Sequence, residues 1–100
     1  MLGKRVIIRG DKSGVFFGTL SKMDVYGGST HIELSDCRRL WYWDGAASLH
    51  QLAKDGVRKP KACKFTVSVD KIVILDAIEI IECTKNAIES IEGVKEWKIS

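Results

Sequence analysis

The sequence predicts an α+β fold: a small, curved antiparallel β-sheet or partial barrel, one main helix over about 45–55 and a short C-terminal helix over about 85–92. Short β-branched runs separated by glycine-rich turns predict the sheet. Apolar stripes at helical spacing, each behind a capping residue, predict the two helices. A chain of 100 residues can form one hydrophobic core and is too short for two, so we expect a single domain over 1–100.

The N-terminal part predicts a meander of three antiparallel strands. Residues 4–10 (KRVIIRG) form the first strand, and after a tight turn the chain returns over 15–22. Gly18 lies inside that second strand and indicates a bulge or a close approach of the backbone. A second turn, Tyr26-Gly27-Gly28-Ser29, precedes a third strand over 30–35, in which apolar and polar residues alternate.

A fourth strand is expected over 38–43 (RRLWYW), after a break at Asp36-Cys37. Successive side chains of a strand point to opposite faces. Leu40 and Tyr42 should therefore face one way, and the other face should carry Arg39, Trp41 and Trp43.

The main helix is expected over 45–55 (GAASLHQLAKD). Asp44 is a good N-cap, and Ala46, Leu49, Leu52 and Ala53 form one apolar face. Gly56 stands where a C-terminal glycine cap belongs, and Pro60 follows it.

Residues 63–82 predict a second strand-rich block. CKFTVSV is followed by a short break near Asp70-Lys71 and then by IVILDAIEII, which could also be a buried helix, although its Ile and Val content favours strand. Thr84 is expected to cap the helix over 85–92 and Gly93 to end it. The last residues, VKEWKIS, alternate and could add an edge strand.

The charge pattern favours a binding protein over a nucleic-acid wrapping protein. The net charge of +3 is too small for a protein that wraps duplex nucleic acid. Residues 1–22 and 54–71 are basic, whereas the last 29 residues are acidic. These segments could complement each other in a homo-oligomer or build a basic pocket for an anion.

The three cysteines, Cys37, Cys63 and Cys83, are widely spaced and indicate buried free thiols in a reducing compartment. No run is long and apolar enough for a membrane span, and no secretory signal follows Met1. We therefore expect a cytoplasmic protein without membrane contact. The cysteines and the two histidines lack metal-ligand spacing, so we expect no metal site and no cofactor.

Catalytic motifs are missing from the sequence. There is no nucleophile elbow, no phosphate-binding glycine-lysine loop and no zinc-protease helix. Ser48 and His50 would point to different faces of a helix, and His31 is typical of an ordinary strand residue. We expect that the protein is not an enzyme.

The most informative stretch runs from Arg38 to Ser48, where two arginines, three aromatic rings and a glycine-led helix start follow one another. A nucleobase can stack on an indole, arginine pairs with phosphate, and free amides at a helix start favour a phosphate oxygen. The candidate ligand contacts are Trp41, Trp43, Arg38, Arg39, Tyr26, Lys64, Gly45 and Ala46.

Other interpretations of these residues remain open. Trp41, Tyr42 and Trp43 are equally typical of a core or a subunit interface, with the arginines lying over the rings. The basic run around Lys64 is typical of a solvated loop. Asp44 counts against a phosphate at the helix start, because its carboxylate would cap those amides and repel an anion.

Four runs carry a family resemblance over most of the chain: GVFFGTL (14–20), RRLWYWDGAASLHQLAKDGV (38–57), CKF (63–65) and EIIECTKNAIESI (79–91). Together they resemble a family of small proteins encoded by bacteriophages and prophages, a domain of unknown function. The resemblance implies a viral origin and a small autonomous fold. In size and aromatic-basic character the chain is also similar to viral sponges of the anti-CBASS type, which form homo-oligomers and hold cyclic dinucleotides.

The leading hypothesis is therefore a bacteriophage protein that binds a cyclic nucleotide immune signal in the host cytoplasm without turning it over. The alternatives are a phage structural or assembly module, whose aromatic block forms a subunit interface, and a protein inhibitor of a host factor. Binding of single-stranded nucleic acid is a fourth hypothesis; duplex binding is not expected.

Overall fold

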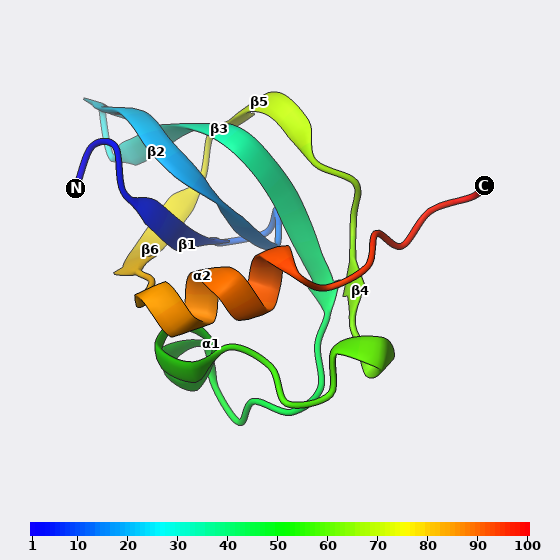
Figure 1. Cartoon of the computed structure of the whole chain (residues 1–100). Helices are drawn as coiled ribbons and strands as arrows, with labels where there is room; N and C mark the ends of the chain where they lie inside the picture. Colours follow the sequence, from blue (N-terminus) through cyan, green and yellow to red (C-terminus); the bar gives the residue numbers. More distant parts are fainter.

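A computed structural model describes residues 1–100. Three strands form an antiparallel meander: β1 (Arg5–Gly10), β2 (Val15–Tyr26) and β3 (Ser29–Tyr42). Figure 1 shows them as the curved sheet that forms the upper part of the molecule. The predicted meander is confirmed. The expected third and fourth strands, however, are one continuous strand, β3.

Strand β3 remains continuous because the expected break at Asp36 is only an irregularity in its register. Asp36 has a φ of 46°, and the pairing of β2 with β3 shifts between Phe17 and Thr19. Gly18 lies at this shift, where an added Cβ would stand 2.6 Å from the Cβ of Cys37. The close backbone approach predicted at Gly18 is confirmed.

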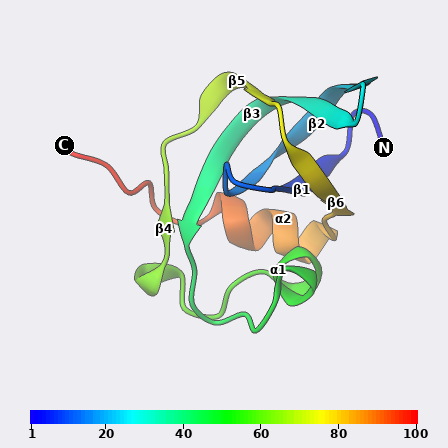
Figure 2. The same ribbon diagram turned by 180° about the vertical axis from the view of Figure 1, so that it is seen from behind.

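Two further strands continue the sheet at either side of the meander. Strand β5 (Val69–Ile74) pairs with β3, and β6 (Ala77–Glu82) pairs with β1. They follow each other along the chain and are not paired, so the six-stranded sheet curls but stays open and does not close into a barrel. Figure 2 shows β5 at the top of the molecule and β6 running down from it toward the helices. The sixth strand, the short β4 (Lys64–Phe65), pairs with the end of β3.

The break predicted at Asp70-Lys71 is misplaced, since both residues lie within β5 and the chain bends at Leu75 and Asp76 instead. The Asp76 carboxylate accepts hydrogen bonds from the amides of Lys12 and Ser13 and from the Ser13 hydroxyl. The corner is therefore fixed to the turn between β1 and β2.

The main helix, α1 (Leu49–Asp55), is shorter than predicted. Ser48, and not Asp44, is its N-cap: the Ser48 hydroxyl accepts a hydrogen bond from the Gln51 amide at 3.1 Å. The Asp44 carboxylate instead accepts from the neighbouring Gly45 amide. Gly56 ends the helix, as predicted.

The second helix, α2 (Lys85–Glu92), has the predicted bounds. Thr84 caps it by accepting a hydrogen bond from the Ala87 amide at 3.1 Å, and Gly93 ends it. Both helices cover the same face of the sheet (Figure 1), together with the 3₁₀ turn η1 (Pro60–Ala62). The α+β architecture predicted from the sequence is therefore confirmed.

The sheet is buried on both faces, which explains its high content of Ile, Val and Phe. One apolar cluster fills the space between the sheet and the helices and includes Ile7, Phe17, Leu40, Leu52, Phe65 and Ile91. The other lies on the opposite face, inside the curl, and includes Val6, Ile8, Phe16, Ile32, Leu34 and Ile74. All three cysteines are free and buried in these clusters.

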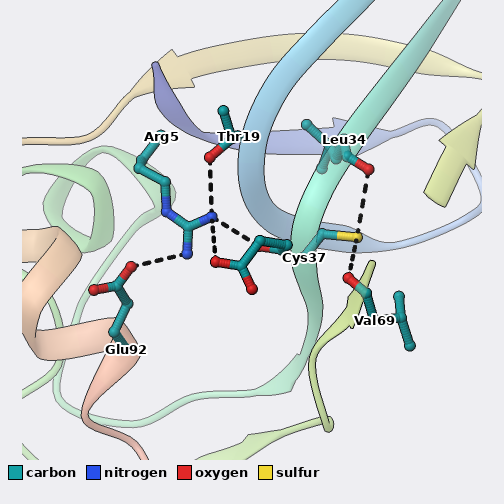
Figure 3. A network of polar contacts seen from close by, with 7 residues as sticks. Arg5, Thr19, Leu34, Cys37, Val69 and Glu92 are labelled. Atoms are coloured by element: carbon teal, nitrogen blue, oxygen red, sulfur yellow. Dashed lines mark hydrogen bonds and ion pairs between the residues drawn. The ribbon is translucent and has the colours of Figure 1, made fainter. Parts of the chain in front are cut away.

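A polar network around Arg5 joins strand β1 to β2 and to α2 (Figure 3). The Arg5 guanidinium donates to the Thr19 hydroxyl at 3.1 Å, to the Asp36 carbonyl at 2.7 Å and to the Glu92 carboxylate at 2.9 Å. A second pair, Arg9 with Glu79, joins β1 to β6. Some of the basic and acidic segments thus complement each other within one chain.

The C-terminal residues form no edge strand beyond one isolated bridge between Phe65 and Glu96. The Trp97 amide donates to the Phe65 carbonyl at 2.8 Å, which holds this segment beside β4. Neither α1 nor α2 has the length and apolar composition that crossing a bilayer would require.

Candidate functional site

Two exposed tryptophans stack on each other next to a lysine. The indole of Trp41 is 61% exposed and that of Trp97 is 48% exposed. Their ring centroids are 6.4 Å apart and their planes differ by 16°. The Lys64 ammonium lies 5.5 Å from the centroid of the Trp97 ring. We call Trp41, Trp97 and Lys64 the tryptophan surface.

Three segments that are distant in the sequence build this surface. Trp41 stands at the end of β3, and Lys64 belongs to β4, where it pairs with Tyr42. Trp97 follows from the C-terminal segment, which the hydrogen bond to Phe65 fixes. In Figure 1 the red C-terminal segment runs past β4 before it leaves the body of the molecule.

The chemistry of this surface suits a flat, negatively charged molecule. Exposed indole faces stack with nucleobases of any sequence, and each stacked base contributes on the order of 1–3 kcal/mol. The ammonium of Lys64 adds a positive charge beside the rings. A ring pair left this exposed is unusual, since aromatic side chains gain more by burial than by stacking in water.

Trp97 was not among the residues singled out from the sequence. The sequence indicates only that Trp97 lies in an alternating segment, VKEWKIS, which predicts an edge strand without naming the strand it pairs with. The pairing of this segment with β4 brings Trp97 to Trp41, and single-sequence patterns do not report which strands pair.

Arg38, a predicted ligand contact, is buried and serves the fold. Only 5% of it is exposed, and its guanidinium donates to four backbone carbonyls. Those carbonyls belong to Phe65, Thr66, Ile91 and Val94. Burial lowers the pKa of Arg38, while Glu96 acts in the opposite direction. The side chain joins β3 to β4 and to the end of α2, and its donors are not free for a ligand.

Arg39, in contrast, keeps its donors free. The guanidinium lies over the Phe16 ring, 4.7 Å from the centroid, and takes part in none of the ion pairs of the chain. It faces a cavity of about 550 Å³ between the turn after β1 and strand β5. Arg39 and Trp41 are two residues apart on β3 and so share one side of it.

The segment that holds Trp43, Gly45 and Ala46 packs against the protein core and does not extend the tryptophan surface. Trp43 and Ala46 pack against the apolar cluster under the helices. Gly45 has a φ of 89°, and an added Cβ would stand 2.6 Å from the Arg58 amide nitrogen. The helix begins only after Ser48, so the amides of residues 45–47 form no helix N-terminus, and the helix start predicted at residue 45 is wrong.

Tyr26 is not brought to the tryptophan surface. It pairs with Ser29 at the opposite end of β3 from Trp41. Its ring is 59% exposed and lies against His31, with centroids 4.8 Å apart. Of the eight predicted contacts, Trp41 and Lys64 both lie beside Trp97, and Arg39 stands two residues before Trp41 on β3.

Groups that could hold a metal ion are not gathered anywhere in the chain: no three His, Cys, Asp or Glu side chains lie together. Apart from the cavity at Arg39, a smaller hollow of about 370 Å³ is lined only by apolar residues, namely Met1, Leu2, Leu20, Met23 and Ile80.

Comparison with known proteins gives one match. A family model described as domain of unknown function (DUF6948) matches residues 3–91. No curated protein and no solved structure matches the chain.

Proposed function

The chain belongs to the family described as domain of unknown function (DUF6948), and we propose that it is a non-catalytic nucleotide-binding protein whose ligand stacks on the tryptophan surface. The observation that carries this proposal is the exposed pair of Trp41 and Trp97 with Lys64 beside it. Stacking would hold the base, and Lys64 would attract the phosphate.

The ligand we propose is a cyclic nucleotide signal of bacterial immunity, which the protein sequesters in the host cytoplasm on behalf of a bacteriophage. The resemblance of the sequence to bacteriophage-encoded proteins supports the viral role. The exposed indoles favour a ligand that contains nucleobases, because any nucleobase can stack on an aromatic ring face. If the protein forms a homo-oligomer, each oligomer would hold several ligand molecules.

A protein-assembly role is the second candidate, and the apolar hollow of about 370 Å³ favours it. Met1 and Leu2 are 59% and 66% exposed, and Met23 is 50% exposed. Contiguous exposed apolar residues are typical of protein interfaces. Under this alternative the protein is a phage structural module or an inhibitor of a host factor.

Thermal denaturation in the presence of a panel of cyclic dinucleotides tests the leading proposal. A ligand at a hundredfold excess over its Kd stabilises the folded state by about 2.7 kcal/mol. For a domain of this size that corresponds to a rise in Tm of roughly 10–20 °C. The matched control is the linear dinucleotide of the same bases. No shift with any cyclic compound would refute the proposal.

Heat release of the bound compound then separates sequestration from catalysis. The proposal predicts that the ligand recovered after denaturation is chemically intact. Recovery of a hydrolysed product would show that the protein is an enzyme.

A further inference from the structure

A cavity beside strand β5 and the turn after β1 lies outside the tryptophan surface. Its volume of about 550 Å³ falls within the range of small-molecule sites. Its lining comes from the turn after β1, from β2, from β3 and from β5 with the corner that follows: Lys12, Ser13, Phe16, Arg39, Ile72, Val73, Ile74, Leu75 and Asp76.

The lining carries a positive charge that no group of the chain neutralises. Arg39 and Lys12 are both absent from the ion pairs of the chain. Asp76 is the one acidic residue of the lining, and its carboxylate already accepts three hydrogen bonds from Lys12 and Ser13. The hydrogen bonds from Ser13 and Lys12 lower the pKa of Asp76. Arg39 and Lys12 carry two positive charges and Asp76 carries one negative charge, so the lining has a net charge of +1 that an anionic ligand could neutralise.

The walls of the cavity are mostly apolar. Phe16 lies beneath the Arg39 guanidinium and is only 2% exposed. Ile72 and Ile74 of β5 form the opposite wall, and the exposed side chains of Val73 and Leu75 form the outer edge. A guanidinium supported by a ring on one side offers its other face and its edge to a flat anion.

We propose that this cavity is a second binding site, which takes a small molecule with a flat apolar body and one anionic group, a carboxylate, phosphate or sulfonate. The apolar body lies against the exposed side chains of Val73 and Leu75, and the anionic group pairs with Arg39, with Lys12 at the rim. The proposal depends on the charge and shape of this cavity and stands apart from nucleotide binding at the tryptophan surface.

Titration with naphthalene-2-sulfonate, followed through the backbone amide resonances of the full chain, tests this site. We expect saturable shifts at residues 12–16 and 72–76, and at least tenfold weaker binding of the neutral naphthalene-2-sulfonamide. Arg39→Gln should weaken sulfonate binding at least tenfold, whereas Arg58→Gln, which removes an exposed arginine outside the cavity, should leave it unchanged.

Two further variants distinguish a loss of binding from a loss of the fold. Arg39→Lys keeps the charge and should retain part of the affinity. Leu75→Asp changes a side chain that is 60% exposed, so the fold should persist, and the new carboxylate should repel the sulfonate. The proposal is overturned if amides 12–16 and 72–76 do not shift, if Arg39→Gln binds like the unsubstituted chain, or if the shifts are confined to residues 41, 64 and 97. The last outcome would leave the nucleotide proposal intact.

Discussion

Trp41 and Trp97 form an offset stack at the end of β3, with planes 16° from parallel and with both rings about half exposed or more. Trp97 reaches this place because its own amide is bonded to Phe65, the residue next to Lys64 in β4. The two-residue strand β4 therefore positions both the Trp97 ring and the Lys64 ammonium, and the tryptophan surface depends on this short strand.

The exposed tryptophans should matter less for stability than Trp43. We expect Trp97→Ala to lower the free energy of unfolding by about 1–2 kcal/mol, because half of the ring is already in water. Trp43→Ala should cost about 3–5 kcal/mol, because Trp43 packs against the core cluster. Urea unfolding measures both. Equal losses would contradict the assignment of Trp97 to a surface role.

Arg38 should be among the most costly residues to replace. Arg38→Met would remove four buried hydrogen bonds to backbone carbonyls, and the loss of such a set costs about 3–5 kcal/mol. The Phe65 and Ile91 carbonyls keep the backbone amides of Trp97 and Val94 as donors. Urea unfolding of Arg38→Met beside Arg58→Met, at an exposed position, provides the comparison. A loss no larger than that of the control would contradict the structural role of Arg38.

Gly18 should tolerate no side chain, whereas Gly28 should tolerate one. Gly18→Ala places a methyl group 2.6 Å from the Cβ of Cys37, and overpacking of this kind costs about 1–3 kcal/mol. Gly28→Ala meets no atom within 4 Å and should stay within about 0.5 kcal/mol of the unsubstituted chain. Thermal denaturation of both variants decides the matter, and similar Tm values would contradict the close packing of β2 on β3.

Alkaline pH should destabilise the fold through Cys83. Burial raises the pKa of this thiol from 9.0 to about 12, with Arg5 opposing the shift and Glu82 adding to it. The native state therefore retains a proton that the unfolded chain loses, and the free energy of unfolding should fall as the pH rises from about 9 to about 12.

The Cys83→Ala variant isolates this effect. The stability of the unsubstituted chain should fall more steeply than that of Cys83→Ala between pH 8 and pH 11, as measured by urea unfolding at each pH. Parallel pH profiles would show that the thiol titrates alike in both states.

The sequence was sufficient for those features that neighbouring residues determine. Thr84 and Gly93 bound α2 because capping is local chemistry, and Gly18 marked a close approach because only glycine fits there. The start of α1 was misplaced for the same local reason: Asp44 and Ser48 are both good caps, and the positive φ of Gly45 prevents the helix from starting at the first.

The candidate site was only partly predictable, because long-range pairing decides it. Arg38 and Arg39 are equivalent in the sequence, yet the alternation of β3 turns the first toward α2 and the second toward the cavity. Trp97 joined the site through its bond to Phe65. Alternation predicts that the two arginines face opposite ways, but which of them is buried, and where Trp97 lies, does not follow from composition or spacing.

Isothermal titration of a cyclic dinucleotide into the unsubstituted chain and into Trp41→Ala, Trp97→Ala and Val25→Ala tests the central claim most directly. Val25 is 70% exposed at the far end of β2 and serves as the control. We expect each tryptophan variant to raise the Kd by roughly 5- to 150-fold, the loss of 1–3 kcal/mol of stacking, and the Val25 variant to bind normally. Unchanged affinity in both tryptophan variants, or no binding heat with the unsubstituted chain, would contradict the account.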